Sequence, residues 1–157
     1  MANTQAMCSS FKGELLTGIH ALGPGTGVPA RTVSTSDTVK AALYVATATL
    51  GASTTVYSAT GEVTNGSGAG YTAGGITVTQ ATAPSTSGTT GIYTPTATFQ
   101  WTSFTSAAAF DTVFLYNSSQ GNKAISVHTF GSQSITAGTF QLTMPAHAAS
   151  TALLRIA

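Results

Sequence analysis

Residues 110–130 read FDTVFLYNSSQGNKAISVHTF, and this stretch predicts a β-hairpin. Its two arms, 110–116 and 124–130, are rich in the aromatic and β-branched residues that favour pleated, half-buried surfaces. The intervening NSSQGN, residues 117–122, contains the Asn, Ser and Gly residues that typically form turns. Two antiparallel strands are therefore expected here.

Further strands are predicted on both sides of this hairpin. From Val39 to Ala46 the side chains alternate between two faces at the two-residue period of a strand. One face is formed by Val39, Ala41, Leu43 and Val45, and the other by Lys40, Ala42, Tyr44 and Ala46. Strands are also expected at 76–81, 92–104, 139–144 and 152–156. Pro95 indicates either an edge position or a break near the start of the 92–104 run, because proline cannot donate to a strand ladder. Residues 21–36, 59–75 and 82–91 have the composition of loops.

The predicted fold is mainly β: an antiparallel β-sandwich, jelly-roll-like, with one N-terminal helix. Seven or eight short strands separated by turns are typical of a sandwich or small barrel. The 157 residues fit a single domain spanning 1–157, with a helix or arm at 1–20 and the sandwich at 37–157.

The helix is expected at residues 4–19, capped by Asn3 or Thr4. Met7, Phe11, Leu15 and Ile19 recur at every fourth position and form one apolar stripe, which Leu16 widens. Two roles are open for the stripe: it packs on the chain's own sandwich, or it docks on a neighbouring subunit. These four residues are the candidate partner-docking site.

Charge is unusually scarce in this chain. Only 6% of residues are charged and the net charge is +1, whereas ordinary soluble domains have about 25% charged residues. Five scattered basic residues cannot displace the counterions of nucleic acid, so nucleic acid is not expected as a partner. No apolar run approaches the roughly 20 residues of a membrane span, and the N-terminus lacks the pattern of a signal peptide.

The ionisable residues do not form a recognisable catalytic or metal-binding motif. The carboxylates Glu14, Asp37, Glu62 and Asp111 are far apart in the sequence, and His20, His128 and His147 have no metal-ligand spacing. Pairings of His128 with Asp111, or of Cys8 with His20, are weaker interpretations than ordinary structural roles. Trp101 is expected in the core, with a sugar-stacking surface as the alternative. We therefore predict no enzyme activity, no catalytic residue, no metal site and no cofactor.

Several stretches resemble a widespread family of small structural proteins of tailed phages. The resemblance is carried by MANTQAMCSSFKGELLTGIH (1–20), KAALY (40–44), YTAGG (71–75), LYNS (115–118), FQLTMP (140–145) and ALLRIA (152–157), and it runs the whole length. It implies a virion component and carries over no catalytic residue.

The function expected from the resemblance and the composition is that of a head decoration, or cement, protein. Such proteins stabilise a capsid through non-covalent contacts made by many copies. The expected partners are the major capsid protein and copies of the chain itself, as a homo-oligomer, on virions assembled in a bacterial cytoplasm. A tail, fibre or adaptor protein and a receptor- or glycan-binding module are the alternatives.

Overall fold

The predicted hairpin forms the centre of the largest sheet. In a computed structural model that describes residues 2–16, 18–23, 36–66, 70–95 and 98–157, β7 (Phe110–Asn117) pairs antiparallel with β8 (Lys123–Gln133). A 3-10 turn, η1 (Ser118–Gln120), joins them, and Gly121 and Asn122 complete the reversal with φ values of 66° and 60°. The hairpin is thus confirmed.

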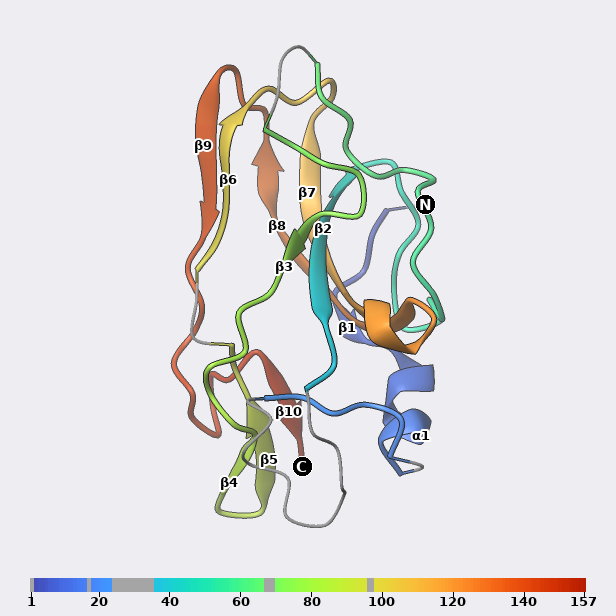
Figure 1. Cartoon of the computed structure of the whole chain (residues 1–157), viewed down its shortest axis with the longest axis vertical. Coiled ribbons are helices and arrows are strands. Elements are labelled where there is room, and N and C mark those ends of the chain that lie inside the picture. Colours follow the sequence, from blue (N-terminus) through green and yellow to red (C-terminus); the bar gives the residue numbers. More distant parts are fainter. Residues whose placement is uncertain (1, 17, 24–35, 67–69, 96–97) are drawn as a thin grey trace.

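Three further strands extend this sheet. β2 (Val39–Val45) lies beside β7, β3 (Ile76–Thr77) lies beside β2, and β1 (Ala6–Met7) lies beside β8. The order is β1-β8-β7-β2-β3, and every pair is antiparallel (Figure 1). Residues 41–44 of β2 are all buried, because both faces of this strand are covered.

Two small antiparallel sheets complete the strands. β6 (Phe99–Phe104) pairs with β9 (Gly138–Leu142), and β5 (Thr90–Tyr93) pairs with both β4 (Ser85–Ser87) and β10 (Leu154–Ile156). The run expected at 92–104 is broken between β5 and β6, which is one of the two outcomes that Pro95 indicated. Phe140 of β9 packs on Phe110 and Phe130 of the large sheet, at ring-centroid distances of 4.8 and 5.3 Å. The described chain is therefore mainly β with one α-helix, in a sandwich-like arrangement.

The helix is shorter than its apolar period indicated. Helix α1 covers Ser9–Leu16, whereas residues 4–19 were expected to be helical. Its C-terminal end is closed by Gly18, with φ 68°, whose N–H binds the carbonyl of Leu15, while the Ile19 N–H binds that of Glu14. This pair of bonds is a Schellman motif, in which glycine supplies the left-handed conformation.

The expected cap residues instead fix an extended N-terminal segment. Asn3 donates to the Val45 carbonyl and to Asp111 and accepts from the Leu50 N–H, and the Thr4 N–H binds the Leu50 carbonyl. The prediction that Asn3 or Thr4 caps the helix is therefore wrong. Long-range partners hold these residues extended before the helix begins.

Two predicted loops contain more structure than expected. β4 lies within the 82–91 segment, where Ser and Thr mask the strand signal. Within 59–75, Glu62, Val63 and Tyr71 are buried rather than exposed. Gly75 explains the close approach of this segment to β2: a Cβ at this position would lie 1.9 Å from the Ala41 carbonyl oxygen.

No helix in the described ranges is long and apolar enough to cross a membrane.

Candidate functional site

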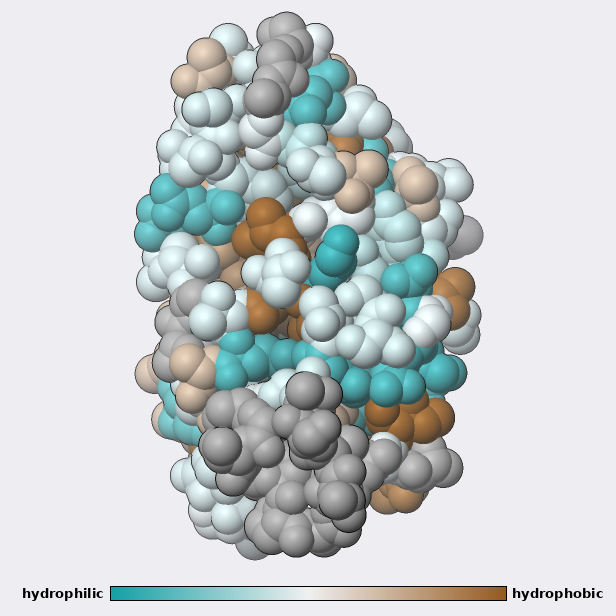
Figure 2. Space-filling view, in the orientation of Figure 1, coloured by the Kyte–Doolittle hydropathy of each residue, from teal (hydrophilic) through white to brown (hydrophobic). Residues whose placement is uncertain are grey.

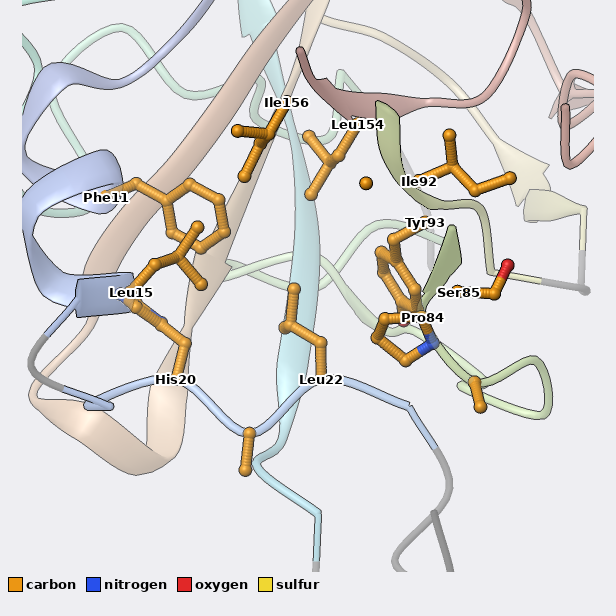
Figure 3. A pocket seen from close by; sticks show the side chains of 13 residues that line it. Phe11, Leu15, His20, Leu22, Pro84, Ser85, Ile92, Tyr93, Leu154 and Ile156 are labelled. Atoms are coloured by element: carbon orange, nitrogen blue, oxygen red, sulfur yellow. The ribbon is translucent and has the colours of Figure 1, made fainter. Parts of the chain in front are cut away.

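The candidate site is an apolar pocket between the helix and the small β4–β5–β10 sheet. It has a volume of about 330 Å³. Figure 3 shows Phe11 and Leu15 on one side, Leu154 and Ile156 on another, and Ile92, Tyr93 and Pro84 across the space between them. Leu22 closes the lower side. The lining consists mostly of carbon, so the pocket suits an apolar group and offers little to a charged one.

The four residues of the candidate docking stripe lie in different parts of the structure and do not form one surface. Phe11 is only 1% exposed and packs edge-on against His20 at a centroid distance of 4.7 Å, so it belongs to the chain's own core. Leu15 is half-buried and lines the apolar pocket. Met7 lies in β1 and lines a second hollow, and Ile19 lies beyond the helix.

Leu16 does not widen this stripe. It is 91% exposed, because the helix ends at this residue and directs it away from the sheet. The sequence interpretation of Leu16 is wrong.

A polar network lies directly behind the apolar pocket. His20 Nε2 is 2.7 Å from Glu14 Oε2, and its Nδ1 accepts a hydrogen bond of 3.0 Å from the Asn117 side chain. Asn117 also donates to Asp37 Oδ2 at 2.7 Å, and Lys123 Nζ lies 2.6 Å from Glu14 Oε1. Both ring nitrogens of His20 are therefore occupied within the protein, and its side chain has no exposed surface. His20 is positioned to hold the fold together.

The two carboxylates of this network are stabilised as anions. Burial raises the pKa of Glu14, but hydrogen bonds from Lys123 and His20 outweigh this effect, so the pKa lies below its ordinary value. Burial also raises the pKa of Asp37. Hydrogen bonds from Gln120, the Ala21 amide and Asn117 outweigh this effect, so the pKa again lies below its ordinary value. The network joins the helix, the segment that precedes β2 and the β7–β8 turn through charged hydrogen bonds.

The second hollow contains the histidine considered for catalysis. Its volume is about 410 Å³, and its lining includes Ser126, His128 and Arg155. Ser126 Oγ lies 2.9 Å from His128 Nε2, and burial lowers the pKa of His128 to about 4. Asp111 binds Asn3 and Thr112 instead, so the pairing of His128 with Asp111 is not observed. Ser126 is 1% exposed, and no carboxylate of the described residues is hydrogen-bonded to His128, so the third group of a catalytic triad is not found there.

The other singled-out residues have structural surroundings. Cys8 is fully buried; burial, with a smaller contribution from Glu14, raises the pKa of its thiol to about 11, and His20 is engaged by Glu14 rather than by Cys8. His147 contacts Ser85 Oγ and the Thr94 amide. Trp101 is 2% exposed and packs near Phe140, so its face is not available for a sugar. The described residues include no group of three or more potential metal ligands.

Sequence reasoning missed a buried carboxylate at Glu62. Tyr71 Oη and the Gly74 N–H both donate to Glu62 Oε1 at 2.7 Å, and Tyr57 donates to the other oxygen. Burial and this carboxylate raise the pKa of Tyr116, which donates to the Gly74 carbonyl, to about 12. The cluster ties Tyr57, Tyr71 and Gly74 to β2, because the Tyr71 hydroxyl also accepts a hydrogen bond from the Leu43 N–H. The sequence carries no local signal for it, because the partners converge only through tertiary folding.

Comparison with known proteins adds no relative to this description. No protein family, no curated protein and no solved structure matches this chain.

Proposed function

We propose that this chain is a structural component of a tailed-phage virion, and specifically a head decoration protein that stabilises the capsid by non-covalent contacts. The observation that carries the proposal is the scarcity of charge: 6% of 157 residues. A freely diffusing protein uses surface charge to stay apart from its copies, whereas a protein in a dense array gains from its absence. The resemblance of residues 1–20, 140–145 and 152–157 to small virion proteins supports the same conclusion.

The surface is consistent with this role. On the face shown in Figure 2, much of the described surface is close to neutral in hydropathy, with hydrophobic patches and a hydrophilic band across the lower half. Glu14, Asp37 and Lys123 are engaged in the internal network, which leaves still less charge for the exterior. Such a surface gives little electrostatic repulsion between neighbouring copies.

The apolar pocket is the proposed attachment point on the capsid. It would accept an apolar side chain of the major capsid protein, and Leu15 and Ile156 at its margin would contribute to the contact. Burial of one large apolar side chain contributes roughly 1.5–3 kcal/mol. Repetition over a closed shell multiplies this modest energy.

The first test is the number of copies in purified virions. Quantitative protein gels should give hundreds of copies per particle for a head decoration protein. A few copies would instead favour the tail, fibre or adaptor alternative, and absence from the particles would refute a virion role. The glycan-binding alternative has lost its main support, because Trp101 lies in the core.

The pocket has its own test on particles assembled without this protein. Purified Ile156→Asp should bind these particles with reduced occupancy, because a carboxylate is costly in an apolar contact. Val56→Asp is the matched control: Val56 is 50% exposed, Ile156 is 48% exposed, and Val56 does not line the pocket. Equal occupancy of the two variants would show that the attachment point is not the apolar pocket.

A further inference from the structure

Strand β9 is an open sheet edge whose features differ from those of the other edges. Within the described residues, β9 is hydrogen-bonded as a strand only to β6, and it runs along the outer side of the molecule (Figure 1). An open edge presents unpaired N–H and C=O groups that pair readily with another strand. Monomeric proteins protect such edges by short length, charge, proline, a bulge or a covering loop.

The other described edges carry one of these protections. β1 and β3 have two residues each. β4 has three residues and follows Pro84, and β10 has three residues that include Arg155. β8 is bulged beyond its pairing with β1. Between two paired positions β8 runs from Thr129 to Gln133, while its partner β7 runs only from Thr112 to Phe110, so β8 contains extra residues.

The outer side of β6 is also protected, by an irregularity within the strand and by contacts of Thr64 and Gly66 just beyond its C-terminal end. The Gly66 N–H binds the Thr105 carbonyl, and the Ala107 N–H binds the Thr64 carbonyl. The register shift in this sheet falls on β6, which advances three residues from Trp101 to Phe104 while β9 changes by two. β9 itself is therefore the regular strand of the pair.

β9 has none of the protections. Its sequence, GTFQL, has five residues with no charge and no proline, and no Asp, Glu, Lys or Arg occurs anywhere from residue 124 to residue 154. Phe140 anchors the strand in the core, while Thr139 and Gln141 are exposed. Like charges placed opposite each other destabilise a strand pair, so an uncharged strand is able to pair with its own copy.

We propose that β9 is a self-association edge, at which β9 of a second copy pairs antiparallel to give a continuous β6-β9-β9-β6 sheet across a two-fold axis. The occupant is a second copy rather than a foreign strand, because the neutral sequence is self-complementary and the same surface serves both partners. A five-residue strand spans roughly 17 Å, so the contact is small and the association is concentration-dependent.

The test uses the purified full chain in solution and no particles, so its failure would leave the proposed virion role untouched. Sedimentation equilibrium should show a concentration-dependent dimer for the wild-type chain. Gln141→Lys should weaken dimerisation by at least about tenfold, because the two-fold axis brings the two introduced charges close together.

Gln100→Lys is the matched control. Gln100 lies directly opposite Gln141 in the β6–β9 ladder and is also exposed, but it is one strand further from the edge. This variant should dimerise within about threefold of the wild type, a difference of less than 1 kcal/mol. A wild-type chain that stays monomeric at the highest soluble concentration, or two lysine variants that dimerise equally well, would overturn the proposal. Thermal unfolding of both variants establishes that each is folded.

Discussion

At the scale of single residues, the polar interior is held by carboxylates that accept several hydrogen bonds each. Asp37 accepts from the Ala21 amide, Asn117 and Gln120, and Glu62 accepts from two tyrosines and the Gly74 amide. Hydrogen bonds to charged groups contribute about 1.5–3 kcal/mol each, more than neutral ones. A chain with four acidic residues thus places at least two of them where they fix the fold rather than where they would meet a ligand.

Stability should therefore fall in acid. The pKa values of Glu14 and Asp37 lie below the ordinary 4.5 and 3.8, so both groups bind protons more weakly in the folded state than in the unfolded state. Their contribution is fully present above the ordinary values and is lost as the pH falls through the folded-state pKa values. Urea unfolding from pH 7 to pH 3 should show a stable plateau and then a decline below about pH 4.

Asp37→Asn tests the assignment of this decline. The variant should be less stable at pH 7, because the neutral amide is a weaker acceptor, and its stability should change less between pH 5 and pH 3 than that of the wild type. A wild-type curve that stays flat down to pH 3 would contradict the account of the network.

At the scale of elements, the short helix separates residues that a regular period had placed together. Phe11 is buried against His20 and the large sheet, whereas Leu16, five residues later, is almost fully exposed. The helix contributes one large aromatic side chain to the core. Its remaining apolar residues line the pocket or face solvent.

This difference gives a paired prediction for stability. Phe11→Ala should reduce the free energy of unfolding by about 3–5 kcal/mol, because it removes a large buried side chain and leaves a cavity. Leu16→Ala should change it by less than about 0.5 kcal/mol, because the side chain is already in water. Urea unfolding of both variants is the measurement, and comparable losses would show that the helix packs differently from this description.

The success of sequence reasoning differed among elements for a physical reason. The β7–β8 hairpin and β2 are specified locally, by a two-residue period and by turn residues such as Gly121. The N-terminal strand β1 was missed because its partner, β8, is distant in sequence. β4 lacks apolar residues, so only its pairing with β5 identifies it. The Glu62 cluster was missed because Tyr57, Tyr71 and Gly74 meet the carboxylate only after folding.

At the scale of the whole molecule, charge is confined to a few places. No Asp, Glu, Lys or Arg occurs from residue 63 to residue 110 or from residue 124 to residue 154. These two runs include β3, β4, β5, β6 and β9 and most of β8. The molecule therefore has large uncharged surfaces, and the contacts available to it are apolar and hydrogen-bonded.

Attachment to the virion should accordingly depend weakly on salt. The screening length falls from about 8 Å at 0.15 M to about 3 Å at 1 M ionic strength, which removes most attraction between exposed charges but leaves apolar contacts in place. With a net charge of +1, occupancy on particles assembled without this protein should vary by less than about twofold between roughly 0.05 and 1 M NaCl. The measurement is quantitative gel analysis of pelleted particles at each salt concentration. Thermal unfolding of the free chain under the same conditions checks that the Glu14–Lys123 pair and the fold survive. A steep fall in occupancy with an intact fold would assign attachment to exposed charges such as Lys12 and Arg155, and would contradict the role given to the apolar pocket.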